Sequence, residues 1–146
     1  MTKAAIFILI LTILIATADA SDKKRCTQKE AMQALTEANT HKDWDSAYKS
    51  FKRFGHCDTG AISEGYSETV GRLLADDWKH FNRLAELCTA DTKFKGFVTK
   101  HINATIPVDV LQNIIDNTRL HCPSEAIALC KAIEDAASSG WEPEKK

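Results

Sequence analysis

Two glutamates, Glu64 and Glu68, have the spacing that most directly allows chemistry in this sequence. Residues four apart share one face of a helix, so both carboxylates can face a cation or a sugar, with Tyr66 and Ser67 between them in the chain. Such pairs also occur on solvated helices, where they cost roughly a few tenths of a kcal/mol. A helical glycosidase needs a glutamate with a raised pKa in a cleft and supporting motifs, and no such motif accompanies this pair. Glu64, Tyr66 and Glu68 are therefore candidate binding residues.

The histidines and cysteines form no metal-binding motif. The chain has five of each, and two pairs are adjacent, His56 with Cys57 and His121 with Cys122. Metal ligands usually recur three or four positions apart on a helix, or as Cys-x-x-Cys, and neither spacing occurs among them. The haem motif Cys-x-x-Cys-His, Gly-x-Ser-x-Gly and a phosphate-binding loop are absent from the sequence as well. We expect no metal and no cofactor.

Two side chains, Ser67 and Cys88, are candidate nucleophiles, but neither has a base close to it in sequence. A triad can also be assembled from residues that are distant in the chain, and sequence spacing does not test that arrangement. Without a catalytic motif, we expect a protein that is not an enzyme.

The first twenty residues have the pattern of a secretory signal peptide. Lys3 is followed by an apolar run from Ala4 to Ala16, and Ala18 and Ala20 are the small residues of a cleavage site after Ala20. The alternative is a membrane anchor, but a spanning helix needs roughly 20 apolar residues and this run is shorter. We expect cleavage, no membrane span in the mature chain, and a secreted or periplasmic location.

Removal of the leader leaves one helical domain, 21–140, and a tail, 141–146. The formal net charge of the whole chain is -1, and the leader carries one charge of each sign, Lys3 and Asp19, so the mature chain keeps this value. Basic and acidic residues alternate along the sequence instead of clustering, which is unlike a nucleic-acid-binding surface or a polybasic membrane patch. We expect neither kind of partner.

The five cysteines predict two disulfides and one free thiol, because thiols of exported proteins are usually paired. If the helices that follow Cys26 and precede Cys57 form an antiparallel hairpin, these two lie within the roughly 4–7 Å between Cα atoms that a disulfide allows. Cys122 and Cys130 can close a small local loop over a helix start. Cys88 is then left over, as a small buried apolar side chain.

Apolar periodicity predicts seven helices. The first follows Thr27, the second runs from an Asp43 N-cap to Gly55, and the third covers about 61–75 after a turn at 58–60. A break at 89–91 separates the fourth from the fifth, Pro107 suits the first turn of the sixth, Pro123 ends it, and the seventh covers about 124–139 with Gly140 following it. The residues expected on the inward faces are Met32, Leu35, Ala38, Trp44, Ala47, Tyr48, Phe51, Ile62, Tyr66, Val70, Leu73, Leu74, Trp78, Phe81, Leu84, Ala85, Cys88, Phe94, Phe97, Val98, Ile102, Val108, Leu111, Ile114, Ile115, Ile127, Cys130 and Ile133.

These helices predict an all-α fold of stacked antiparallel hairpins, because no alternating strand pattern, hairpin turn or glycine-rich loop competes with them. Short connections allow either a compact orthogonal bundle or a small solenoid. Trp78 falls at core spacing, whereas Trp141 lies beyond the last helix and is the aromatic residue most available for contacts. Both join the candidate binding residues.

Three resemblances bear on function. Residues 42–51, with the turn and amphipathic helix that follow, resemble the helical hairpin of a tetratricopeptide-type repeat, although no second copy occurs at a period near 34 residues. The runs 60–68, 73–78, 97–102 and 121–123 are similar to small uncharacterised exported bacterial proteins, which implies an envelope location. A leader before a short disulfide-bearing helical domain also resembles insect odorant-binding proteins. That family expects a further cysteine shortly after the second, near Ala61, and this chain lacks it.

Export, helical hairpins, near-neutral charge and missing catalytic motifs favour a non-catalytic binding domain of the cell envelope. Its partner would be a protein, as in inhibitor or immunity-type complexes. The alternative is a secreted carrier of small apolar ligands, which the odorant-binding resemblance implies. A peptidoglycan-acting enzyme that uses Glu64 is the third reading.

Overall fold

The computed structural model describes residues 24–140, and helices make up most of this range. The predicted all-α fold is confirmed, and no strand occurs within 24–140. The predicted signal peptide and the tail with Trp141 lie outside the described residues. The elements in chain order are α1 (Gln28–Glu37), α2 (Trp44–Phe54), η1 (Gly55–Cys57), α3 (Gly60–Asp76), η2 (Trp78–His80), α4 (Phe81–Ala90), α5 (Thr92–Lys100), α6 (Val108–His121), η3 (Ser124–Ala126) and α7 (Ile127–Gly140), where η marks a short 3-10 helix.

Side-chain caps explain where several helices begin. The predicted N-cap Asp43 accepts a hydrogen bond from the Ser46 amide at 2.7 Å, which satisfies one of the free N–H groups in the first turn of α2. Asp91 does the same for the first turn of α5, and so separates it from α4. Gly60, the first residue of α3, has a φ of +53°, a conformation that favours glycine, so the turn at 58–60 ends in a residue suited to it. Pro107 is the N-cap of α6 and stands one residue before the predicted position.

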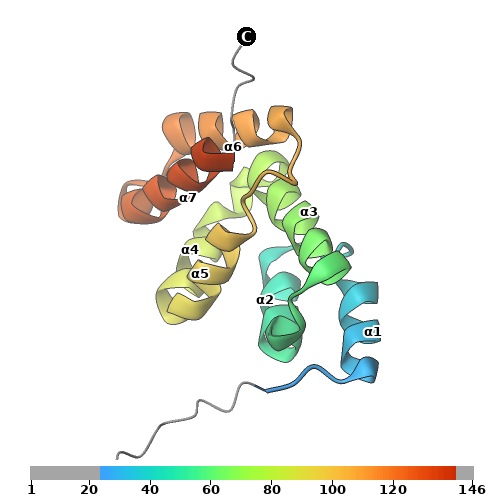
Figure 1. Cartoon of the computed structure of the whole chain (residues 1–146). Helices are drawn as coiled ribbons and strands as arrows, with labels where there is room; N and C mark the ends of the chain where they lie inside the picture. Colours follow the sequence, from blue (N-terminus) through green and yellow to red (C-terminus); the bar gives the residue numbers. More distant parts are fainter. Residues whose placement is uncertain (1–23, 141–146) are drawn as a thin grey trace, which may run out of the picture.

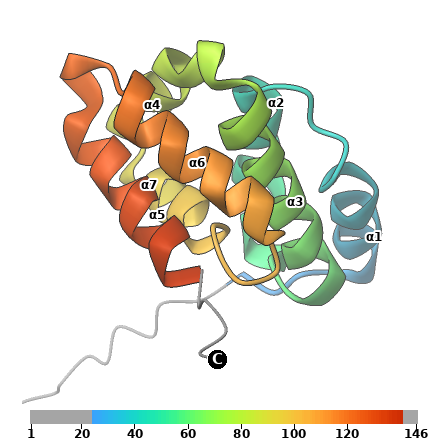
Figure 2. The ribbon, with the colours of Figure 1, turned by 90° about the horizontal axis from the view of Figure 1, so that it is seen from above.

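The helices pack around one core. Figure 1 shows α1 and α2 side by side at one end and α6 beside α7 at the other. From above, α6 lies between α3 and α7 (Figure 2). Helices that are not neighbours in the chain also touch, because α2 contacts α4 and α5, and α5 contacts α7. In a solenoid each unit contacts only its neighbours, so this arrangement is a bundle.

Most of the predicted inward residues are buried, including all five of α3, but four are exposed. The exposed four are Met32 and Leu35 of α1, Val108 of α6 and Ile127 of α7. Helix α1 lies at the edge of the bundle and buries its small residues instead, with Ala34 at its centre and Ala38 at its end. Val108 and Ile127 are each the first residue of a helix, α6 and α7, and the buried face of each helix begins three or two residues later, at Leu111 and Leu129. The prediction that these four face inward is wrong.

Both predicted disulfides are present. Cys26 and Cys57 join the entry of α1 to the exit of α2 with a Cα–Cα distance of 5.0 Å, and Cys122 and Cys130 close the α6–α7 connection at 6.2 Å. Cys88 is a free thiol buried in the core, and burial raises its pKa to about 12. It therefore stays protonated and unreactive at neutral pH. None of the helices within 24–140 has the length and apolar character that crossing a membrane requires.

Candidate functional site

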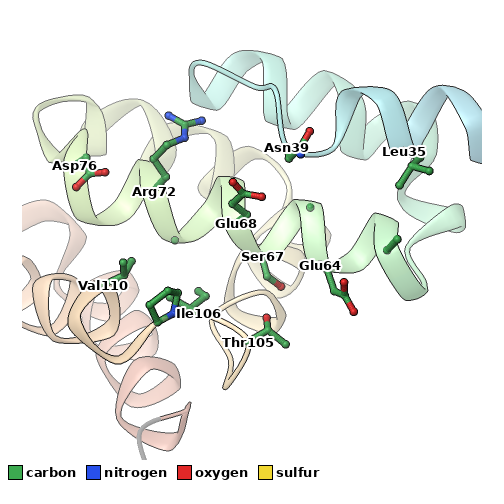
Figure 3. Close-up of a pocket in the computed structure, with 14 residues that line it drawn as sticks. Leu35, Asn39, Glu64, Ser67, Glu68, Arg72, Asp76, Thr105, Ile106 and Val110 are labelled. Carbon is green, nitrogen blue, oxygen red and sulfur yellow. The ribbon is translucent and has the colours of Figure 1, made fainter.

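One side of α3 forms the floor of an open groove of about 720 Å³. Leu35 of α1 stands at one wall, and Ile106 and Val110, from the loop before α6 and from α6 itself, stand at the other (Figure 3). We term this the α3 groove, and its charged side chains all come from α3. A second hollow, near Cys88, has about 250 Å³.

Two glycines of α3 bring the walls close to its backbone. A Cβ atom on Gly65 would lie 2.9 Å from the Cβ of Ala38, closer than such atoms approach one another. A Cβ atom on Gly71 would lie 3.1 Å from the Cδ1 of Ile106. The end of α1 and the loop before α6 therefore pack directly on α3, and the depth of the groove depends on these two positions.

The groove is acidic. Glu64 and Glu68 lie on α3 as predicted, both are exposed, and Asp76 continues the row of carboxylates toward the end of the helix (Figure 3). No hydrogen bond or ion pair within residues 24–140 engages these three carboxylates. Arg72, the basic residue of the groove, donates to the carbonyl oxygen of His41 and is thereby held toward the α1–α2 connection. The groove thus carries three carboxylates against one guanidinium, and the carboxylates form no ion pair within the described residues.

Apolar side chains accompany these carboxylates. Leu35 is 51% exposed and Met32, one turn earlier on α1, is 65% exposed. Near the opposite wall, Val108 at the start of α6 is 54% exposed and lies between the groove residues Pro107 and Val110 in the chain. Large apolar side chains in the open are informative when they gather beside a concavity, because they mark sites for a partner or ligand.

A buried chain of hydrogen bonds runs beneath the groove. Ser67, whose side chain borders the groove, is 3.0 Å from His101 Nδ1, and His101 Nε2 is 3.1 Å from Asp58 Oδ2. The three come from the middle of α3, the C-cap of α5 and the turn before α3. Asn103 donates a further hydrogen bond to Ser67 Oγ at 3.1 Å. His101 is fully buried, with its ring centroid 4.4 Å from that of Phe97.

The charges around this chain assign its protons. Burial raises the pKa of the Asp58 carboxyl, but hydrogen bonds from His101 and Lys100 outweigh burial and hold that pKa well below its usual range. Asp58 is therefore an anion that accepts from His101 Nε2–H. A ring that carries its proton on Nε2 alone has its lone pair on Nδ1, and there it can accept a hydrogen bond from the Ser67 hydroxyl.

The remaining sequence candidates lie elsewhere. Tyr66 is buried in the core, its hydroxyl 2.9 Å from Ser50 Oγ, and it does not line the groove. Trp78 stacks on Phe81 with ring centroids 4.2 Å apart and donates from Nε1 to the carbonyl of His121. Of the predicted binding residues only Glu64 and Glu68 share the groove, and Trp141 is outside the described residues.

Sequence reasoning missed Leu35, which was assigned to the core, and the groove walls on the loop before α6. It also missed the pairing of Asp58 and His101 with Ser67. The sequence places Asp58 in the turn at 58–60, and no local pattern there indicates its contact with His101. Because His101 and Asp58 are 43 residues apart, only the tertiary structure shows that they meet.

One group of metal-ligand types occurs within the described residues, at Cys26, His56 and Cys57. Their ligand atoms lie within 4.8 Å of one another, and His56 Nε2 is also 3.4 Å from Glu30 Oε1. The two sulfurs are bonded to each other, so this pair offers no thiolate to a metal ion. In the oxidised protein the two cysteines of this cluster therefore serve as a structural disulfide.

Comparisons of the chain with protein-family models, curated proteins and solved structures found no match.

Proposed function

We propose that this protein is an exported recognition domain that binds a partner protein in the cell envelope or outside the cell through the α3 groove. The signal-peptide pattern supports export, and two disulfides are compatible with an oxidising compartment. The observation that carries the proposal is the row of three carboxylates, Glu64, Glu68 and Asp76, which form no ion pair within the described residues and lie in one groove with the exposed Leu35.

The chemistry of the groove selects a cationic, amphipathic segment as the occupant. Lysine or arginine side chains of the partner would neutralise the carboxylates on the floor, and its apolar side chains would cover Leu35, Ile106 and Val110. A helix laid into a groove presents both kinds of residue at the required spacing. An inhibitor or immunity-type role would follow if the covered segment belongs to the working surface of the partner.

Crosslinking of the secreted chain to envelope proteins, with identification of the crosslinked segment, tests this proposal. The double variant Glu64→Gln with Glu68→Gln should weaken binding about tenfold, because two charge contacts are worth roughly 1–2 kcal/mol together. The matched control is Glu125→Gln, an exposed glutamate on η3 outside the groove, which should leave the affinity unchanged. A partner whose affinity is equal for all three proteins and insensitive to salt would refute the groove as the binding site.

The volume of the groove favours one second candidate, a carrier of small apolar ligands. About 720 Å³ lies within the size range of small-molecule sites, and the walls are apolar. Saturable uptake of a fluorescent apolar probe, blocked by Leu35→Glu, would support the carrier and argue against a protein partner.

A peptidoglycan-acting enzyme remains the third reading. It would use Glu64, which lies exposed in the groove. Turnover of purified peptidoglycan that vanished in Glu64→Gln would establish this activity in place of recognition.

A further inference from the structure

The hydrogen-bonded chain under the α3 groove has the parts of a nucleophilic site. Ser67 Oγ, His101 Nδ1 and Asp58 Oδ2 are joined by contacts of 3.0 Å and 3.1 Å, within the range expected between a nucleophile, its base and the group that orients the base. The catalytic triad is recognised by geometry and roles and not by residue order. Here the aspartate precedes the serine, and the histidine follows it.

We propose that Ser67 is the nucleophile of an acyl-transfer site, with His101 as its general base and Asp58 as the residue that positions His101. The substrate class is an ester with a small acyl group, which reaches Ser67 from the groove. This activity goes beyond the recognition role and does not depend on a protein partner.

The reaction balances without any further co-reactant except water. Ser67 Oγ bonds to the ester carbonyl carbon while its proton moves to His101 Nδ1, and the bond from that carbon to the alcohol oxygen then breaks as the alcohol takes the proton. Water next attacks the acyl group on Ser67 and gives its proton to His101. The carboxylic acid leaves, and Ser67 regains a proton from His101.

The contacts of His101 suit this sequence of steps. In the proposed site Asp58 accepts from Nε2–H, which leaves the Nδ1 lone pair for the Ser67 proton. Lys100 Nζ lies 2.6 Å from the same Asp58 oxygen, which fixes the carboxylate in place. The histidine uses Nδ1 toward the serine and Nε2 toward the aspartate, the reverse of the ring orientation in serine proteases.

Asn103 is the candidate oxyanion donor beside the proposed nucleophile. Asn103 Nδ2 donates to Ser67 Oγ at 3.1 Å and to the Lys100 carbonyl at 3.2 Å, while its Oδ1 accepts from Thr105 N and Oγ1. The side-chain amide is therefore held from both ends beside Ser67, and in the proposed reaction the N–H that it gives to Ser67 Oγ would turn to the oxygen of the tetrahedral intermediate. Side-chain amides of asparagine perform this role in known acyl-transfer sites.

Access limits the size of the acyl group. Ser67 is only 2% exposed, although it borders the groove, and Ile106 packs over Gly71 one turn further along α3. Because so little of Ser67 is exposed, the proposed substrate carries an acyl group no larger than acetyl. The groove then holds the alcohol part of the ester, beside Glu64 and Thr105 (Figure 3).

The test uses the secreted chain with its disulfides intact. A small fluorophosphonate should add once, at Ser67 by peptide mapping, and 4-nitrophenyl acetate should be hydrolysed with an acetyl group trapped on Ser67 at low pH. Ser67→Ala should abolish both signals, and His101→Gln should lower both rates at least about 100-fold, the usual share of a general base. The exposed serine variant Ser124→Ala is the matched control and should change neither.

The variant Asp58→Asn tests whether Asp58 positions His101 for the reaction or only stabilises the fold. An asparagine amide donates to Nε2 and moves the ring proton to Nδ1, so labelling should slow at unchanged KM while the circular-dichroism spectrum is retained. Nitrogen-15 shifts of His101 should report the change of tautomer.

Labelling of the wild-type protein tests the proposal even if these variants fail to fold. Folded wild-type protein that takes up no fluorophosphonate, or that is labelled equally after heat denaturation or at another serine, would overturn it.

Discussion

The two faces of α3 are built for different purposes. The face toward the core carries Tyr66, Val70, Leu73 and Leu74, each about 1% exposed. The face toward the groove carries exposed glutamates, which make no ion pair within the described residues. The difference shows that one helix can hold the bundle together on one side and leave charges free on the other, with Ser67 at the boundary. Substitutions on the two faces should therefore separate stability from function.

The largest effect is expected on the core face. Leu73→Ala removes a side chain that is 1% exposed, and we expect the free energy of unfolding to fall by about 2–5 kcal/mol through lost burial and the remaining cavity. Chemical denaturation monitored by circular dichroism measures this loss. The exposed Leu120, at 73%, is the control, and Leu120→Ala should cost less than about 1 kcal/mol. Equal losses at both positions would contradict the assigned core.

Gly65 should be the next most sensitive position. Gly65→Ala forces the new Cβ against Ala38, and we expect a net loss of about 1 kcal/mol, since a clash of roughly 1–3 kcal/mol outweighs the helix preference of alanine. Gly96→Ala is the matched control, because nothing lies within 4 Å of its Cβ. That variant should gain about 0.5–1 kcal/mol. Thermal unfolding of the two variants should show changes in stability of opposite sign. A gain in stability for both would contradict the close contact of the end of α1 with α3.

Acid should lower the stability of the fold through His41, which packs on the core face of α3. This histidine is 6% exposed and stacks on Tyr66 with ring centroids 6.3 Å apart, and burial lowers its pKa, although Glu37 and Asp43 act in the opposite direction. The unfolded chain therefore takes up the proton first. Stability should fall as the pH drops below about 6.5, by at most about 1.4 kcal/mol per pH unit, until the pH reaches the lowered value.

Urea unfolding of the wild type and of His41→Asn between pH 7 and pH 5 measures this contribution. The variant should lose the part of the slope that His41 causes. If stability depends on pH in the same way in both proteins, His41 does not contribute to the loss of stability in acid.

The smallest effect on stability is expected on the groove face. Glu64→Gln with Glu68→Gln removes a like-charge pair on an exposed helix surface, so the free energy of unfolding should rise by only about 0.2–0.5 kcal/mol. Thermal unfolding at low salt measures the change, which should shrink at high salt. A loss above about 1 kcal/mol would mean that these carboxylates support the fold.

The sequence predicted the core face of α3 well and the groove only in part. Large apolar residues at helical spacing locate a buried face wherever a helix lies inside the bundle, as for Val70 and Leu73. Helical spacing wrongly predicted that Met32 and Leu35 are buried, because α1 lies at the edge of the bundle and Ala38 at its end packs against Gly65. Helical spacing also placed Glu64 and Glu68 on one surface.

The Asp58, Ser67 and His101 chain could not be predicted in this way. Its contacts join residues 34 and 43 positions apart, and the packing of α5 against α3 determines that they meet. No local pattern around His101 distinguishes it from the other four histidines.

The two disulfides each join cysteines that are consecutive in the chain, with Cys88 between the pairs. Because a polypeptide emerges N-terminus first, Cys26 can form a disulfide with Cys57 before any competing thiol has appeared. Cys122 and Cys130 emerge last and only eight residues apart, so they find each other faster than either finds Cys88. The order of emergence thus favours the native pairing without an isomerase, provided that α4 folds early enough to hide the odd thiol.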